Sequence, residues 1–224
     1  MAQAKKPRER TTAKGEATRN QVLDASEILF GSNGYLGTSL RDIAEQAGVR
    51  MGLVHYHFGN KHEILDAALE RKLGLLRSTI SASFAQAESK AGGELNLEGM
   101  VTAFILPFLH AVSSDGDPLR SYIIMTSHLM SSYRLPELRP ILGKLNTISA
   151  ILIDHLRRNV PNISEGNLLA GVYLIEAALI FMVQDPGFLD DLSRDHHSVA
   201  RLEDIARPAL RFFTSGLESL REPT

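Results

Sequence analysis

The part of the sequence best equipped for chemistry runs from Thr38 to Lys61. Its second half, Arg50 to Phe58, is too short and too polar for a core helix. One side of that stretch is apolar and can be buried, through Val54 and Phe58 together with Val49 just before it. The other side presents Arg50, Met51, Leu53, His55 and Tyr56. An exposed face of this kind can reach base edges in the major groove of DNA.

A first short helix is predicted just before that stretch, from apolar residues at i, i+3, i+4 and i+7: Leu40, Ile43, Ala44 and Ala47. Ser39 is placed to cap it, and Asp42 stands where a capping box needs an acceptor. Gly48 separates the two helices, and small residues there let them cross steeply. A recognition helix needs one buried face that fixes its angle and one exposed face that reaches the bases. The segment therefore predicts a helix-turn-helix that binds double-stranded DNA.

Other chemistry is poorly supported by the residues. His55 and His57 are two apart on a helix and point to different faces, so we expect no metal site there. His196 and His197 precede the last predicted helix and are expected in a surface loop. There is no Ser/His/Asp order, phosphate-binding glycine loop or HExxH pattern. The absence of cysteine excludes disulfides and thiolate metal sites. We expect neither an enzyme nor a bound cofactor.

The elements that must position these residues are helical throughout, because apolar residues recur at helical spacing and strand-like alternation is absent. A helix around Val22 to Leu29 precedes the motif. Asn60 can cap a long helix from Lys61 to about Ala87. Later helices are predicted at Leu97 to Ser113, Pro118 to Ser131, Pro136 to Val160, Leu168 to Val183 and Ser198 to Leu220, the last interrupted at Pro208. The predicted fold class is all-α.

Charge is distributed unevenly along the chain. Residues 1–20 carry a net +4, which leaves −6 on the rest of a chain of net charge −2. A basic arm before an acidic body suggests a polyanion partner, although a solvated, disordered tail explains the same charges. No apolar stretch near the N-terminus suggests a signal peptide. Leu168 to Val183 is short for a membrane span. We therefore expect a cytoplasmic protein with no membrane partner.

Several spaced elements around the motif resemble the DNA-binding region of the tetracycline-repressor (TetR) family. They are Ile28-Leu29-Phe30, Gly34-Tyr35, Thr38-Ser39-Leu40-Arg41-Asp42-Ile43-Ala44, Ala47-Gly48-Val49, Tyr56-His57-Phe58 and Asn60-Lys61. The resemblance covers about residues 19–66, and the remainder agrees only in being helical and of suitable length. It implies three parts: a basic, flexible arm at 1–18, a three-helix DNA-binding domain at 19–66, and a helical-bundle ligand-binding and dimerisation domain at 67–224.

The resemblance also implies residue roles. Thr38 and Ser39 would hold a phosphate, and Arg41 would reach a phosphate or a base. Five residues would face the bases: Arg50, Met51, Gly52, Leu53 and His55. Tyr56 and Lys61 would contact the DNA backbone, while His57 and Phe58 would anchor the recognition helix to the core. Met51 and Leu53 are apolar where polar readers are usual, which favours contact with thymine methyl groups.

Assembly is suggested by the stretch Leu168 to Val183, which is apolar around its whole circumference apart from Glu176. Such a helix needs cover on both sides, and a second copy of the chain would supply it, forming a four-helix interface with the last helix. Either charged substitution, Ile175→Arg or Phe181→Arg, is expected to give monomeric or insoluble protein. The alternative is a helix buried centrally within one subunit.

A small-molecule effector is expected between the middle helices, where apolar and occasional polar residues mix. The candidate ligand residues are Phe104, Tyr122, Met125, His128, Leu129, Arg134, Glu176 and Phe181. An ordinary core with satisfied polar groups explains each of them equally well. The function predicted is a ligand-responsive repressor, released from a palindromic operator by a largely apolar effector. The alternatives are a constitutive regulator whose C-terminal part only dimerises, and a helical adaptor that has lost DNA binding.

Overall fold

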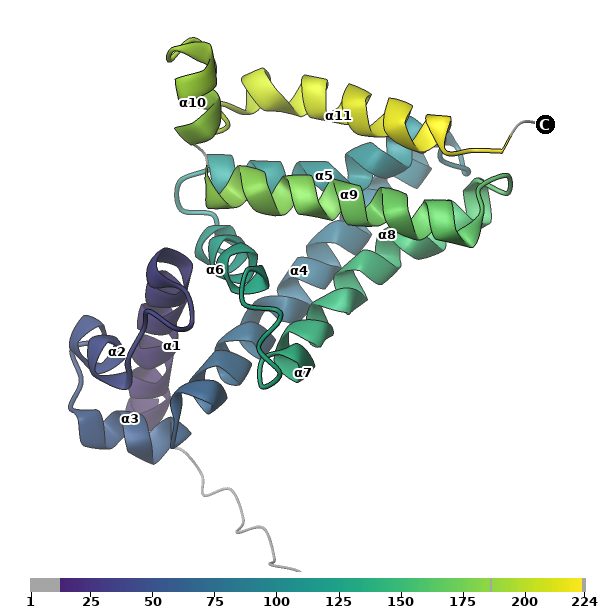
Figure 1. Cartoon of the computed structure of the whole chain (residues 1–224). Coiled ribbons are helices and arrows are strands. Elements are labelled where there is room, and N and C mark those ends of the chain that lie inside the picture. The colour runs from purple at the N-terminus through teal and green to yellow at the C-terminus, as the bar shows by residue number, and fades with distance from the viewer. Residues whose placement is uncertain (1–12, 186, 223–224) are drawn as a thin grey trace, which may run out of the picture.

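The computed structural model describes residues 13–185 and 187–222, and the described residues form helices with no named strand (Figure 1). The first group of helices is α1 (Ala13–Asn33), α2 (Leu40–Gln46) and α3 (Met51–Phe58). The long α4 (Lys61–Ala91) leaves this group and enters the second. The second group continues with α5 (Leu97–Ser113), α6 (Arg120–Met130), α7 (Arg139–Leu142), a 3-10 turn (Gly143–Leu145), α8 (Asn146–Asn159), α9 (Glu165–Gln184), α10 (Gly187–Ser193) and α11 (Leu202–Ser219).

The first group forms one end of the continuous hydrophobic core, called here the first core. α1 contributes Val22, Leu23 and Phe30, which are fully buried. They are covered by Ile43 of α2, Val54 and Phe58 of α3, and Ile64 and Leu65 of α4. Because α4 supplies residues to this core and Leu76 to the second group, one continuous helix connects the two parts.

The structure differs from the prediction near both ends of the chain. The basic arm was expected to reach residue 18, but α1 begins at Ala13, because Ala13, Lys14, Glu16 and Ala17 favour or tolerate a helix. The rest of that arm, residues 1–12, lies outside the described residues. At the other end Pro208 lies inside α11 without interrupting it. The buried face of α11, formed by Ala209, Phe213 and Leu217, offsets the loss of one backbone hydrogen bond.

Two short elements were not predicted. α10 begins at Gly187, and none of its residues is buried, so no helical stripe marks it. The stretch expected to begin one long helix near Pro136 instead forms α7 and the 3-10 turn before α8 begins at Asn146. α9 is long and apolar enough to cross a bilayer by length and composition alone, a property that core helices share.

Candidate nucleic-acid interface and ligand cavity

The first short helix of the motif begins at the predicted cap. The Ser39 Oγ accepts a hydrogen bond from the Asp42 N–H (3.2 Å), and the Asp42 carboxylate accepts one from the Ser39 N–H (2.8 Å). These bonds to Ser39 lower the pKa of Asp42. The capping box is confirmed, and it fixes where α2 starts.

The turn between α2 and α3 depends on Gly48, whose φ of +65° is the left-handed conformation that side chains with a Cβ disfavour. The Val49 N–H donates to the Ala44 carbonyl (3.0 Å) and the Gly48 N–H to the Glu45 carbonyl (3.1 Å). These bonds close the turn and set the angle at which α3 leaves it.

α3 has the two faces expected of a recognition helix. Val54 and Phe58 are buried in the first core, where the Arg19 guanidinium lies 5.1 Å from the Phe58 ring centroid. On the opposite face Met51, Leu53 and Tyr56 are 38%, 41% and 73% exposed. Between them Gly52 has open space where a side chain would be. These exposed apolar side chains lie outside the buried core.

The polar residues of α2 and α3 that were predicted to contact DNA make contacts that a ligand can replace. Arg41 pairs with Glu45 at 2.9 Å, and both side chains are largely exposed. An exposed pair of this kind contributes little, so Arg41 is free to turn to another anion. The His55 Nδ1 lies 2.9 Å from the Gly59 carbonyl. Arg50 occupies the N-cap position of α3 without a side-chain capping bond, and it is exposed. His57 is partly buried between Tyr56 and Phe58.

Two of the predicted DNA-binding residues, Thr38 and Lys61, bond to backbone carbonyl oxygens of the protein itself. The Thr38 side chain is buried, and its hydroxyl donates to carbonyl oxygens of Leu29 (3.1 Å) and Gly34 (2.8 Å). The prediction that this hydroxyl holds a phosphate is therefore wrong, since it joins the end of α1 to the start of α2. The Lys61 Nζ donates to the Tyr35 carbonyl (2.7 Å) and the Thr38 carbonyl (2.8 Å). Burial lowers the pKa of Lys61, which stays tied to the same turn.

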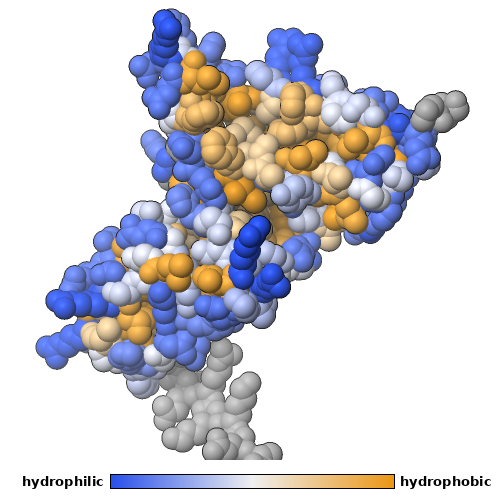
Figure 2. Space-filling view, viewed as in Figure 1, coloured by the Kyte–Doolittle hydropathy of each residue, from blue (hydrophilic) through white to orange (hydrophobic). Residues whose placement is uncertain are grey.

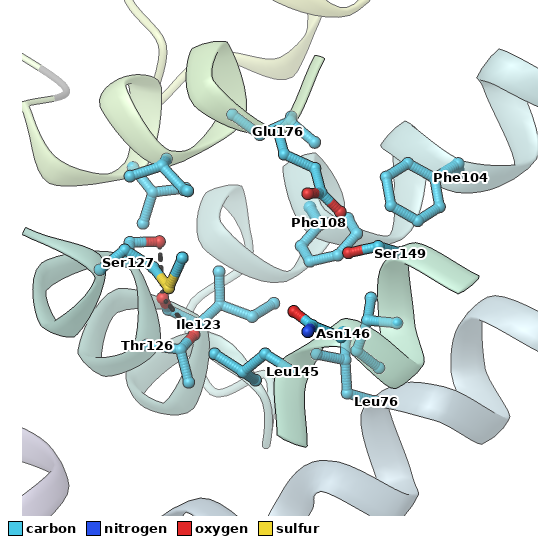
Figure 3. Close-up of a pocket in the computed structure, with 15 residues that line it drawn as sticks. Leu76, Phe104, Phe108, Ile123, Thr126, Ser127, Leu145, Asn146, Ser149 and Glu176 are labelled. Carbon is cyan, nitrogen blue, oxygen red and sulfur yellow. Dashed lines mark hydrogen bonds between the residues drawn. The ribbon is translucent and has the colours of Figure 1, made fainter. Parts of the chain in front are cut away.

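A cavity of about 110 Å³ lies within the second group of helices, between α4, α5, α6, α8 and α9 (Figure 3). Its wall is mostly apolar, with Phe104, Phe108 and Leu179 among the lining residues. The polar side chains that reach it are Thr126, Ser127, Asn146, Ser149 and Glu176. A small pocket of this kind, apolar with a few polar groups, is typical of ligand sites.

Two of the eight predicted ligand residues, Phe104 and Glu176, line this cavity. The other six do not: Tyr122, Met125, His128, Leu129, Arg134 and Phe181. The reason is helical geometry, because the face of α6 toward the cavity carries Ile123, Thr126, Ser127 and Met130. The remaining two positions lie on the surface: Arg134 is exposed, and Phe181 is half exposed on α9.

The opposite side of α6 contacts the DNA-binding group. The buried Glu27 carboxylate of α1 accepts hydrogen bonds from Ser121 of α6 (3.1 Å) and Lys72 of α4 (2.7 Å), and it also pairs with Arg71. A Cβ on Gly31 would lie 3.3 Å from Ile124 Cγ2, so α1 and α6 approach closely. α6 is thus a wall shared by the cavity and α1.

Tyr122 has a structural task within the same wall. It is fully buried, and its hydroxyl donates to the Leu69 carbonyl of α4 (2.8 Å). Burial raises the pKa of this hydroxyl above its ordinary value. Tyr122 therefore fixes α6 to α4, which explains why a polar aromatic residue in this region is not a ligand contact.

An exposed apolar surface covers the outer side of α9 and the neighbouring helices α10 and α11, and Figure 2 shows hydrophobic side chains gathered there. Its large side chains are Leu169, Tyr173, Leu174, Phe181, Phe188, Leu192 and Phe212, each between 43% and 76% exposed. The inner face of α9 packs in the core and includes Ile175, which is 1% exposed. Ile175 is therefore a core residue, and the prediction that it lies in a subunit interface is wrong.

Comparison with known proteins agrees with this arrangement. Residues 22–68 match the family described as bacterial regulatory proteins, tetR family. Residues 102–216, half of the chain, match the tetracyclin repressor-like C-terminal domain. The chain belongs to the TetR family. Both the predicted family and the predicted all-α fold, with an N-terminal helix-turn-helix and a C-terminal helical domain, are confirmed.

Curated relatives of this TetR-family chain match over part of its length. The transcriptional regulator TtgR of Pseudomonas putida is 43% identical over 61 residues, which is 27% of this chain and 29% of that protein. The transcriptional repressor KstR2 of Rhodococcus jostii is 25% identical over 129 residues, 58% of each chain. The alignments thus span less than two thirds of either relative.

Solved structures resemble the TetR-family chain over nearly its whole length. FadR from Bacillus subtilis, in complex with stearoyl-CoA, has a TM-score of 0.58 at 20% identity, covering 88% of this chain and 98% of that one. A TetR-family regulator from Shewanella has a TM-score of 0.63 at 15% identity, covering 92% and 99%. At this level of identity the likeness shows a shared fold.

Most residues that line the cavity of this TetR-family chain were not singled out from the sequence. Phe108, Asn146, Ser149 and the cavity face of α6 were missed because candidates were chosen by residue type. A usable signal was present: Ile123, Thr126, Ser127 and Met130 stand at i, i+3, i+4 and i+7, which defines one helix face.

Proposed function

We propose that the chain is a dimeric transcriptional regulator that binds a palindromic DNA site and acts as a repressor released by a small molecule. The observation that carries the DNA-binding part is the division of α3. Val54 and Phe58 hold it in the core, while Met51, Leu53 and Tyr56 remain exposed on a helix at the edge of the first group. Exposed apolar side chains beside Gly52, which leaves room for close approach, suit the major groove.

The contacts around this helix support phosphate binding at its flanks. The Ser39 hydroxyl accepts one bond in the capping box and retains its own proton for donation. Arg41 is held only by an exposed pair, and the Tyr56 ring is 73% exposed. Lys61 uses two of its three donors on the Tyr35 and Thr38 carbonyls. These groups would position the protein on DNA, and the exposed face of α3 would provide sequence preference.

Release by an effector is proposed because one helix borders both the cavity and the DNA-binding group. A ligand that displaces Ile123 or Thr126 would shift α6, and Ser121 and Ile124 on the same helix contact α1. α4 offers a second route, since Leu76 lines the cavity and Lys61 holds the turn before α2. A tenfold loss of DNA affinity needs about 1.4 kcal/mol of difference in ligand affinity between the two states.

A homodimer is proposed because of the apolar surface on α9, α10 and α11. Contiguous apolar surface of this kind on a globular protein marks an interaction site. A second copy would cover Leu174, Phe181 and Phe212 and pair α9 and α11 with their equivalents across a twofold axis. Two recognition helices related by that axis would then read the two halves of a palindrome. We place the protein in the cytoplasm and assign it no catalytic activity, in keeping with relatives that are transcriptional regulators.

The test is a footprint of the purified chain on the DNA upstream of its own coding sequence, followed by titration at several salt concentrations. We expect a protected, near-palindromic segment and an affinity that falls steeply with salt. Small molecules that raise the melting temperature of the protein are then added to the complex. If every stabilising molecule left DNA affinity unchanged at saturation, the protein would be a constitutive regulator. If the chain protected no DNA segment at any salt concentration, the proposal that it binds DNA would be contradicted.

A further inference from the structure

Glu176 is an acidic group in an apolar wall. It stands on the cavity side of α9, and Figure 3 shows its carboxylate directed into the cavity toward Ser149 and Phe108. Among the described residues that line the cavity it is the one titratable group, and no ion pair joins it to a described cation. Burial raises its pKa, while the Ser149 hydroxyl opposes this rise. A carboxylate removed from water is costly unless a partner compensates it.

The surrounding polar atoms are mostly acceptors. The Thr126 and Ser127 hydroxyls donate to the Ile123 carbonyl, at 3.1 and 2.8 Å, so that their oxygens retain only lone pairs for a ligand. Asn146 lies at the exposed mouth of the cavity and can serve either way. The inner part of the cavity therefore lacks a cation and offers a carboxylate and hydroxyl oxygens, which matches a ligand rich in donors.

The size of the cavity limits the rest of the ligand. A cavity of about 110 Å³ is somewhat smaller than the ~150 Å³ engineered cavity that holds benzene. Phe104 and Phe108, with ring centroids 5.5 Å apart, add aromatic faces to which cations are attracted. A long acyl chain cannot be enclosed in a volume of this size, and an anionic head group would meet the Glu176 carboxylate.

We propose that the cavity binds a compact, largely apolar amine of about one ring, whose ammonium group is held by Glu176. This inference rests on the proposed function in so far as the cavity is taken to be the effector site. Glu176 accepts hydrogen bonds from the ammonium, and the hydroxyl oxygens of Thr126 and Ser127 are the further acceptors on the facing helix. The phenylalanine rings and Leu179 enclose the apolar part.

Three probes of similar size but different charge test this directly: benzylamine, benzyl alcohol and benzoate. Binding to the ligand-free full chain is measured by titration calorimetry at neutral pH, where benzylamine is a cation. We expect wild-type protein to bind benzylamine at least tenfold more tightly than either other probe. Glu176→Gln should weaken benzylamine at least tenfold and leave benzyl alcohol within about twofold. Glu165→Gln, which removes an exposed carboxylate from the same helix, is the matched control and should change neither affinity.

Several results would overturn the proposal. They are no binding of benzylamine, equal or tighter binding of benzoate or benzyl alcohol, and unchanged benzylamine affinity in Glu176→Gln. A melting curve of that variant checks that the fold is intact. DNA affinity is measured separately. If benzylamine bound through Glu176 without altering DNA affinity, the amine site would stand and the effector-release part of the proposed function would fail. If benzylamine did not bind while another small molecule released the DNA, the amine site would fail and the proposed function would stand.

Discussion

Lys61 holds its ammonium against two carbonyl oxygens and 4.2 Å from the centroid of the Tyr35 ring. The side chain thus stabilises the turn before α2, and its third donor is available to a phosphate. This geometry gives Lys61 two tasks, one in the fold and one in the interface, which can be separated by experiment.

Lys61→Ala is expected to weaken binding to all duplexes alike, and to reduce the slope of log affinity against log salt by roughly one ion. The readout is fluorescence anisotropy at several salt concentrations. Lys90→Ala removes the same charge from the exposed far end of α4, and it should leave both quantities unchanged. A lower melting temperature with an unaltered salt slope would show that Lys61 acts only through the turn.

Glu176 gives a pH dependence that can be measured without any ligand. Because burial raises its pKa, the folded state holds a proton there at pH values where the unfolded chain has released its own. Folding therefore loses stability as the pH rises from the ordinary glutamate range through the raised value. Glutamine carries no such charge, so Glu176→Gln should be more stable than wild type at neutral pH.

The greater stability of Glu176→Gln should disappear below the ordinary glutamate pKa of about 4.3, because the Glu176 carboxyl group is then protonated in both the folded and the unfolded chain. Urea denaturation at a series of pH values measures the difference in the free energy of unfolding. An advantage that stayed constant down to that pH would mean that ionisation of Glu176 is not its source.

At the scale of elements, the turn between α2 and α3 fixes the pose of the recognition helix, and it does so through one left-handed glycine. Gly48→Ala places a Cβ in open space, so only the backbone conformation opposes it, at about 1–2 kcal/mol. Gly74→Ala is the matched control, because Gly74 lies in α4 with open space around it and should gain roughly 0.5–1 kcal/mol. Chemical denaturation should give a lower free energy of unfolding for Gly48→Ala and a higher one for Gly74→Ala. Destabilisation by both would contradict this account of the turn.

Helices with strong local signals could be predicted from the sequence. Ser39 and Asp42 specify the start of α2, and Asn60 the start of α4, because their side chains satisfy free backbone groups of the next turn. α10 could not be predicted in this way, since it has no buried stripe. The partner of the Thr38 hydroxyl could not be predicted either, because a hydroxyl at a helix start can face a phosphate or a carbonyl of another helix.

The residues that line the cavity could also be predicted only in part from the sequence. Phe104 and Glu176 were predicted as ligand residues, but residue type alone also selected Tyr122, which holds α6 to α4. Which face of α6 meets α1 and which meets the cavity depends on packing among α1, α4, α5 and α9. Neighbours far apart in the sequence decide this, and the spacing of residues within α6 defines only the faces themselves.

At the scale of the whole molecule, a single chain leaves the apolar outer side of α9 exposed to solvent. A charge placed in a dry interface costs several kcal/mol, so the double substitution of Leu174→Arg with Phe181→Arg should abolish a dimer. Both side chains are about half exposed in the single chain, so the fold should persist. Light scattering should change from roughly twice 24.6 kDa to about 24.6 kDa.

Leu36→Arg is the control for that experiment, because Leu36 is 72% exposed in the turn between α1 and α2, away from the apolar surface. It should remain dimeric. Wild-type protein that ran as a monomer at micromolar concentration would remove the basis for palindromic recognition.

The central claim is that α3, presented twice by a dimer, reads DNA. Selection of duplexes from a random library by the purified full chain, followed by sequencing, tests it most directly. The account predicts enrichment of near-palindromic sites whose half-sites are centred about 34–36 Å apart. It also predicts that Leu53→Ala, which alters only an exposed side chain, changes the preferred bases in both halves alike. Enrichment of no sequence, or of one unpaired half-site with a preference indifferent to Leu53→Ala, would contradict it.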